Sequence, residues 1–241
     1  MTSPTADAFT ERLLALASER ERAERLRYFK TGAGDYAEHD TFAGVRMGEV
    51  FRLAKEFIDL PDDEVERLLD SPVHEVRAGA LSIMDKRARR RATTPEQRRA
   101  LFELYLRRHD RIDSWDLVDL AAVHVVGGYL VDRDRDVLDE LARSEVVWER
   151  RTAIMATLYL VRAGKLDDTY RIAATLLHDD HDLIHKPVGG LLRETGKHDR
   201  QRLLAFLDEH AASMPRTMLR YAMEHLDADT RRHYRSLTRT V

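Results

Sequence analysis

A tryptophan and an aspartate stand four residues apart in the stretch SWDLVD, which runs from Ser114 to Asp119. Residues four apart share one face of an α-helix, so Trp115 and Asp119 would point the same way, with Asp116 on the flank of that face. An indole ring and a carboxylate both attract positive charge. On a water-facing helix the pair would be ordinary surface, whereas in the wall of a cleft it could hold a cationic ligand.

Three other segments share a common order. Each begins with a few residues that interrupt a helix, continues with a basic residue, and then runs into a helix of small and apolar residues. They are SPVHEVRAGALSIM (71–84), SEVVWERRTAIMAT (144–157) and HDLIHKPVGGLL (181–192). Aligning their basic residues places Arg77, Arg151 and Lys186 in register, and SWDLVD falls where an intervening repeat is expected. Residues at one phase of a repeat array face the same way. We therefore expect these cations to form a positive stripe that suits a nucleic-acid backbone.

Helical periodicity dominates the chain that must position these residues. Apolar residues recur at spacings of three and four, and no segment alternates with the period of two that marks a strand. Short breaks such as LPDDE, SPVHE, TTPEQ and MPR separate the helices. The repeat length of roughly 37 residues is somewhat shorter than the ~40–47 residues of HEAT-like repeats. The sequence predicts an all-α fold, in which residues 1–241 form a single curved HEAT-like solenoid with a concave DNA-binding face.

Composition limits the classes of protein to which the chain can belong. Of its 241 residues 43% are hydrophobic and 34% charged, and none is cysteine. The lack of cysteine excludes disulfides and thiolate chemistry and favours a reducing compartment. No apolar run approaches the ~20 residues of a membrane span, and the N-terminus is too charged for a secretory signal, so we expect a cytoplasmic protein. We also expect a monomer. The net charge of −3 makes the distribution of cations more informative than their sum.

Five segments together resemble the DNA alkylation repair family typified by the AlkD alkylpurine DNA glycosylases, which are built from HEAT-like repeats. In the family's order they are RYFKTGAGDYAEHDTFAGVRMGEV, SWDLVD, WERRTAIM, DLIHKPVGGLLRETGK and MPRTMLRYAMEHL, and they cover nearly the whole length. The resemblance implies excision of N3- or N7-alkylated purines from duplex DNA by hydrolysis of the N-glycosidic bond. It also implies that neither a metal nor another cofactor takes part.

The resemblance assigns roles to individual residues. The family's catalytic aspartate, which ends its W-D-x-V-D motif, falls on Asp119, and the tryptophan that opens the motif falls on Trp115. The cleft arginine that follows a tryptophan by three falls on Arg151. The N-terminal tyrosine falls on Tyr28. The expected DNA-binding residues are Tyr28, Lys30, Arg77, Lys186 and Arg193.

One family position is changed. The second cleft tryptophan, expected in the pattern K-x-x-G-W-x-L-R-E, is replaced by Gly190. Glycine costs a helix about 0.8–1 kcal/mol relative to alanine, and a purely structural site would not obviously keep two in a row, as Gly189 and Gly190 are. The cleft should be wider at Gly190. Either it admits bulky adducts while Asp119 still hydrolyses the bond, or the protein binds DNA without excising a base.

The chemistry also follows from the residue types. Alkylation at N3 or N7 gives the purine a positive charge and makes it a better leaving group, and bond cleavage builds oxocarbenium character on the sugar. Asp119 would stabilise that charge and orient the attacking water. Trp115 would pack against the sugar or the cationic base, and Arg151 would anchor a flanking phosphate. The resemblance further implies that the lesion is processed while still stacked in the duplex, so that selection rests on charge and on the lability of the bond, and we expect neutral lesions to be poor substrates.

Other interpretations remain open at the level of sequence. A HEAT-like scaffold that binds protein would explain the helical pattern without any catalysis. The basic run DKRARRR (85–91) suits either a solvated helix end or phosphate contacts. The cluster HDDHDLIH (178–185) lacks the spacing of a catalytic zinc site and is typical of a surface loop.

Overall fold

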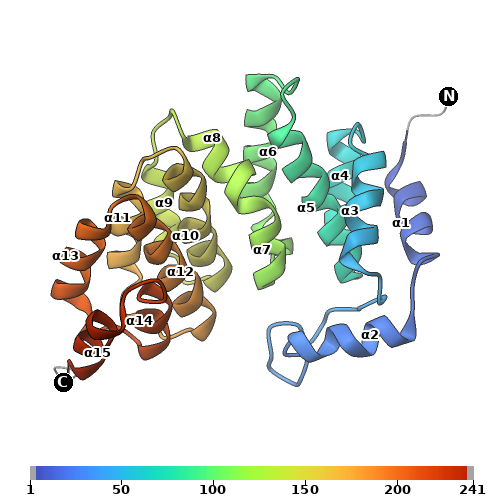
Figure 1. Cartoon of the computed structure of the whole chain (residues 1–241). Coiled ribbons are helices and arrows are strands. Elements are labelled where there is room, and N and C mark those ends of the chain that lie inside the picture. Colours follow the sequence, from blue (N-terminus) through green and yellow to red (C-terminus); the bar gives the residue numbers. More distant parts are fainter. Residues whose placement is uncertain (1–3, 238–241) are drawn as a thin grey trace. The chain divides into compact units, whose positions relative to one another are not determined.

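The computed structural model describes residues 4–237, and within them it contains helices and no β-strand (Figure 1). One isolated bridge pairs Thr41 with Val73. The all-α prediction is confirmed. The chain divides into two compact units, Met1–Val125 and Val126–Val241. A continuous solenoid and a single domain stay predictions, and each unit is described by itself.

The first unit is built around one long, buried helix. Its elements are α1 (Ala6–Leu14), α2 (Glu19–Arg25), the 3₁₀ turn η1 (Leu26–Tyr28), α3 (Met47–Glu56), α4 (Asp62–Leu69), α5 (His74–Arg89), α6 (Pro95–Arg107), the 3₁₀ turn η2 (His109–Arg111) and α7 (Trp115–Ala121). Helix α5 packs against α3, α4, α6 and α7. Its sequence is apolar or small from Ala78 to Met84, so it can be covered on all sides, and its first turn buries charged residues as well.

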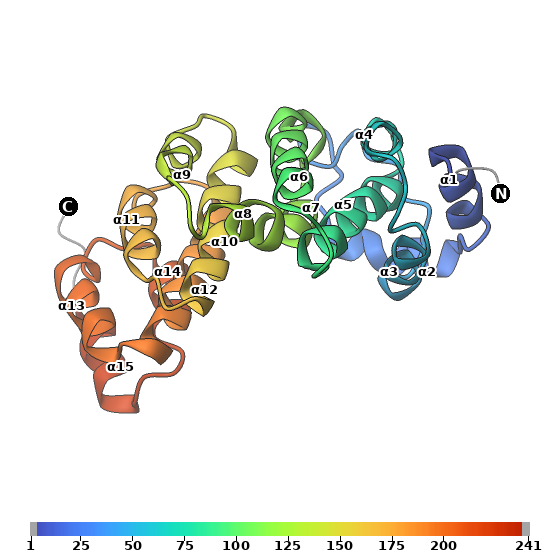
Figure 2. The same cartoon turned by 90° about the horizontal axis from the view of Figure 1, so that it is seen from above.

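The second unit has two layers of helices (Figure 2). Its elements are α8 (Gly128–Leu130), α9 (Asp136–Ala142), α10 (Val147–Arg162), α11 (Asp167–Thr175), α12 (Asp182–His198), α13 (Arg200–His210), α14 (Arg216–Ala222) and α15 (Ala228–Ser236). Helices α10, α12 and α14 pack successively on one another, while α9 and α11 pack on α10 and α13 packs on α12. This alternation of inner and outer helices is the arrangement that paired helical repeats produce.

Several helix ends follow the signals in the sequence. Thr94 and Gln97 form a reciprocal capping box at the start of α6, with Pro95 at the first helical position. Gly164, at φ +76°, ends α10 in the left-handed region that glycine tolerates. A π-helix, labelled η3 (Ala122–Gly127), follows α7 directly. None of the described helices is both long enough and apolar enough to cross a membrane.

Candidate active site

A cavity of about 480 Å³ opens beside α7 in the first unit. Trp115 and Asp119 both line it, as expected for residues four apart on one helix face, and Tyr28 lines it as well. The structure therefore brings together three of the predicted site residues. The other lining residues are Glu21, Glu24, Arg25, Phe29, Val45, Arg46, Met47, Phe51, Asp116 and Leu120.

Aromatic packing fixes the position of Trp115. Its ring stacks on Phe29, with ring centroids 5.7 Å apart and an angle of 26° between the planes. Phe29 in turn contacts Phe42, at 4.8 Å between centroids, and both belong to a small buried cluster. Tyr28 is held less firmly and is 75% exposed. Trp115 is thus a preformed wall of the cavity, while Tyr28 stands at its solvent edge.

The charges around the cavity favour a cationic ligand. Four carboxylates line it, on Glu21, Glu24, Asp116 and Asp119, against the two guanidinium groups of Arg25 and Arg46. Both cations and two of the carboxylates are engaged within the fold, because Arg46 pairs with Glu21, Arg25 with Glu75, and Asp116 with His74. A planar cation placed here would meet an indole face and a surplus of carboxylates.

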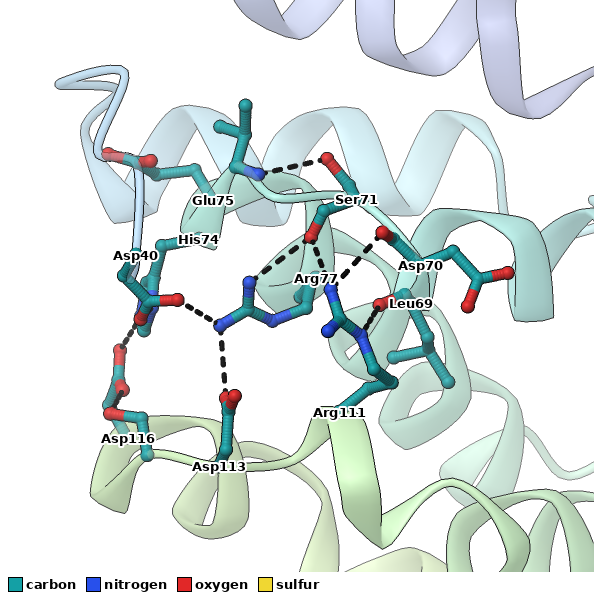
Figure 3. A network of polar contacts seen from close by, with 12 residues as sticks. Asp40, Leu69, Asp70, Ser71, His74, Glu75, Arg77, Arg111, Asp113 and Asp116 are labelled. Atoms are coloured by element: carbon teal, nitrogen blue, oxygen red, sulfur yellow. Dashed lines mark hydrogen bonds and ion pairs between the residues drawn. The ribbon is translucent and has the colours of Figure 1, made fainter. Parts of the chain in front are cut away.

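A chain of buried ion pairs lies behind this wall (Figure 3). His74, at the start of α5, has no exposed surface, and its Nδ1 lies 2.8 Å from Oδ2 of Asp40. Its Nε2 lies 2.9 Å from Oδ2 of Asp116, whose other oxygen accepts a hydrogen bond from the Ser114 hydroxyl at 2.8 Å. The network joins the segment before α3 to the first turn of α7.

The network shifts the pKa values of its members. Burial opposes a charge on His74, but hydrogen bonds to Asp116 and Asp40 outweigh it and raise the pKa of His74 to about 9. Burial likewise opposes the charge on Asp116, yet the hydrogen bond from His74 keeps the pKa of Asp116 below its ordinary value. The pKa of Asp40 is lowered against its burial by His74 and Arg77. These three groups are therefore charged together near neutral pH.

Arg77 belongs to this network and is only 1% exposed. Its Nη2 donates to Oδ1 of Asp40 at 2.6 Å and to Oδ1 of Asp113 at 3.0 Å, and its Nη1 donates to the Ser71 carbonyl at 3.1 Å. A guanidinium enclosed in this way cannot reach a DNA phosphate. We therefore remove Arg77 from the expected DNA-binding residues, and its charge serves instead to balance Asp40 and Asp113.

The alignment of Arg77 with Arg151 and Lys186 is wrong by one residue. Arg77 is the fourth residue of α5, whereas Arg151 and Lys186 are the fifth residues of α10 and α12. The true equivalents of Arg77 are Arg150 and His185, because all three side chains hydrogen-bond the carbonyl six residues earlier, on Ser71, Ser144 and Asp179. Aligning on charge alone displaced the first segment by one residue. Asp119, the fifth residue of α7, shares the phase of Arg151 and Lys186.

The remaining predicted cations differ in their surroundings. Lys30 and Lys186 are exposed. Arg151 is only 7% exposed, and its Nη1 donates to the backbone carbonyl of Leu183 on α12. Arg193 is half-buried and forms ion pairs with Glu194 and Glu224. Two lysines are therefore presented to solvent, while both arginines are engaged by the second unit itself.

The two adjacent glycines of α12 have different surroundings. A Cβ on Gly189 would lie 2.3 Å from the Met218 carbonyl and 2.7 Å from Cβ of Tyr221, so glycine is required there for the close packing of α12 on α14. A Cβ on Gly190 would meet no atom of the described residues within 4 Å. Gly190 instead borders a hollow of about 340 Å³ in the second unit. Our expectation that a structural role would not keep both glycines is therefore wrong for Gly189.

Sequence reasoning missed the polar support of the site. Asp116 lines the cavity although the helix spacing places it only on the flank of the face that Trp115 and Asp119 share, and the sequence does not predict the roles of His74, Asp40 or Arg25. One signal was available: His74, Glu75 and Arg77 begin a helix that is otherwise small and apolar, and charged residues in such a helix need buried partners. In the basic run 85–91, ion pairs of Arg87 with Asp62 and Arg90 with Asp59 favour a helix end.

Comparison with known proteins identifies the family of the chain. The family model described as DNA alkylation repair enzyme matches residues 9–226. A solved structure described as a predicted DNA alkylation repair enzyme from Enterococcus faecalis is similar with a TM-score of 0.68 and 17% sequence identity, over 88% of this chain and 97% of that chain. No curated protein matches the sequence. The resemblance of the five segments is thus confirmed, and the chain belongs to the family of DNA alkylation repair enzymes.

Proposed function

We propose that the protein is a DNA glycosylase that hydrolyses the N-glycosidic bond of cationic N3- or N7-alkylated purines in duplex DNA. The observation that carries this proposal is the joint placement of Trp115 and Asp119 in one acidic, aromatic cavity. Membership of a DNA alkylation repair family supports DNA as the partner and an enzymatic role.

In the proposed reaction the oxygen of a water molecule bonds to C1′ of the deoxyribose while the bond from C1′ to the purine nitrogen breaks. The bonding electron pair leaves with the base and neutralises its positive charge. Asp119 stabilises the oxocarbenium character of the sugar and accepts the proton of the water, which it later releases to solvent. The products are the free alkylated base and an abasic site.

Selectivity in this proposal comes from charge. A cationic purine is attracted by the Trp115 ring and by the carboxylates around it, and it is also the better leaving group. A neutral adduct has neither advantage. The test compares release of 7-methylguanine and of a neutral adduct from otherwise identical duplexes. We expect abasic sites to form much faster with the cationic lesion, and equal rates would contradict charge selection.

For DNA contacts we propose Tyr28, Lys30 and Lys186, with Arg151 as the anchor of a flanking phosphate. Arg25 also lines the cavity, but we leave it out of this set, because its guanidinium pairs with Glu75 and donates to the Val45 carbonyl. Phosphate contacts of this kind make affinity fall with salt concentration. Binding to undamaged duplex should therefore weaken steeply between low and high salt.

We propose that Gly190 widens the DNA-facing surface of the second unit where the family has an indole, so that bulky adducts are accepted. The open space around its Cα supports this reading. Two alternatives are a module that binds DNA without excising a base and a scaffold that binds protein, and one observation favours the scaffold. Arg77 and Arg193, two of the expected DNA-binding cations, form ion pairs within the fold. Salt-dependent DNA binding without base release would identify the module that binds DNA but does not excise a base. A lack of any DNA binding would favour a protein scaffold.

A further inference from the structure

His74 takes no direct part in the proposed chemistry, yet it is enclosed one layer behind the cavity wall. Each of its ring nitrogens faces a carboxylate, at 2.8 Å and 2.9 Å, on Asp40 and Asp116. An ionised carboxylate only accepts hydrogen bonds, so a ring that meets one on either side must donate from both nitrogens. An imidazole with both nitrogens protonated is an imidazolium cation. Geometry therefore indicates a charged, buried histidine.

The charged groups around His74 come from every element that packs on it. Asp40 precedes α3, and Asp116 belongs to α7. Beyond Asp40 lies Arg77 of α5, which also pairs with Asp113. Beyond Asp116 lies Arg25 of α2, which helps to keep that carboxyl ionised.

The neighbouring residues hold the ring in place. Glu75 accepts hydrogen bonds from the backbone N–H groups of residues 43 to 45 and so holds the same segment that carries Asp40. The Phe42 ring stacks on the imidazole at 4.7 Å, and the Phe29 ring meets it edge-on at 5.0 Å. Phe29 is also the residue on which Trp115 stacks. The histidine is thus in contact with both the polar and the aromatic support of the cavity.

Asp116 connects His74 to the helix that carries the candidate active site. Both of its carboxylate oxygens are occupied, one by His74 and one by Ser114. Asp116 lies directly after Trp115 and three residues before Asp119 on the same short helix. Because α7 continues without a break into the π-helix η3, the contacts of Asp116 hold the N-terminal turn of α7, which carries Trp115, rather than the whole helix.

We propose that His74 is a positioning residue for the candidate active site: its imidazolium ties Asp40 to Asp116 and so holds the first turn of α7, with Trp115 and Asp119, in the cavity wall. This role rests on the proposed glycosylase function. His74 itself does not touch the substrate. When the ring loses its proton, one of the two carboxylates loses its donor, and the polar connection between α7 and the segment before α3 is broken.

The charge of His74 can be tested in the wild-type protein without any enzymatic reaction. Nitrogen-detected NMR of the histidine rings, assigned by comparison with His74→Gln, should show both ring nitrogens protonated at pH 7.5 and loss of a proton near pH 9. The Asp116→Asn variant should lose that proton at a lower pH. A neutral His74 ring at pH 7.5 would overturn the proposal.

The positioning role is tested by single-turnover excision of 7-methylguanine. We expect His74→Gln to lower the rate of base release by ~10-fold or more at saturating enzyme, because small displacements of reacting groups are costly, while the affinity for DNA stays unchanged. The wild-type rate should also fall as pH rises through about 9, and His74→Gln should lack this decline. His109→Gln is the matched control, since His109 is buried outside the cavity, and it should behave as wild type.

The outcomes separate this inference from the proposed function. A wild-type protein that releases no base overturns the glycosylase proposal, and the positioning role with it. An active wild type whose rate and pH profile are unchanged in His74→Gln overturns the positioning role alone. If His74→Gln does not fold, the ring signals of His74 are identified by their change in Asp116→Asn, and that variant and the wild-type NMR titration decide in its place.

Discussion

The guanidinium of Arg151 donates a hydrogen bond to the backbone carbonyl of Leu183. In a regular α-helix that carbonyl would accept from the N–H of residue 187, which here is a proline without an N–H. Proline is tolerated in the first turn of a helix, but Pro187 is the sixth residue of α12 and lies beyond that turn. Pro187 therefore leaves the Leu183 carbonyl without its helical donor, and Arg151 donates to that carbonyl instead.

Replacing Pro187 should therefore affect Arg151. In Pro187→Ala the new N–H would compete for the Leu183 carbonyl, so we expect weaker binding of duplex DNA together with a more stable helix, by about 1–3 kcal/mol. Equilibrium binding and urea unfolding measure the two effects. Pro95→Ala is a suitable control, because a proline at the first helical position displaces no helical hydrogen bond. Unchanged DNA affinity in Pro187→Ala would show that this contact does not prepare Arg151 for DNA.

The paired glycines of α12 provide a matched test of packing. Gly189→Ala should lower the free energy of unfolding by about 1–3 kcal/mol, because its Cβ would collide with the Met218 carbonyl. Gly190→Ala should raise it by about 0.8–1 kcal/mol, since the methyl group meets open space and alanine favours the helix. Urea unfolding of the two variants checks this. Effects of the same sign would contradict the packing described.

Restoring the family's indole tests the role of the open space. Gly190→Trp should reduce excision of bulky adducts and leave that of 7-methylguanine nearly unchanged, because only the larger lesion needs the vacated volume. Rates for both lesions are compared with those of Gly190→Ala, which adds little volume. An equal loss for the two lesions would argue against a size filter at this position.

Stability should depend on pH through His74. Its pKa rises from about 6.5 to about 9 in the folded protein, so the folded state binds this proton more tightly. The resulting stabilisation is complete below about pH 6.5 and is lost as pH rises through about 9. We expect the free energy of unfolding to fall by roughly 1–3 kcal/mol over this range, and His74→Gln to lack that decline. An identical decline in both proteins would contradict a buried, charged His74.

The same network has an opposite effect in acid. Because the pKa values of Asp40 and Asp116 are lowered on folding, their stabilisation is present above about pH 4 and is lost as pH falls through their folded pKa values. Wild-type stability should therefore be greatest between about pH 4 and 6.5 as far as these three groups determine it.

The parts of the site that depend on local spacing could be predicted from sequence. Trp115 and Asp119 share a helix face because they are four residues apart, and no tertiary information is needed to see it. Helical periodicity likewise predicts the all-α fold. The register of the repeats was harder, because residue type alone does not separate Arg150 from Arg151.

The supporting residues depend on contacts between distant segments. Asp40 meets His74 across 34 residues, and His74 meets Asp116 across 42. Gly189 is required by Met218, which lies on a different helix. The charged start of α5 indicates that buried partners exist, but no pattern within one helix identifies those partners. Burial turns Arg77 from an expected DNA contact into an internal counter-charge, and only the packing of α5 reveals that burial.

We propose that Asp119, beside Trp115, hydrolyses the glycosidic bond, and this role is the basis of the proposed function. It is tested most directly by abasic-site formation in a duplex with a single 7-methylguanine, measured for wild type, Asp119→Asn and the control Asp63→Asn, whose carboxylate is exposed on α4 away from the cavity. We expect abasic sites with wild type and Asp63→Asn, and a loss of at least 100-fold with Asp119→Asn (on the order of one essential catalytic group) at unchanged DNA affinity. Abasic sites formed by Asp119→Asn at the wild-type rate would contradict it.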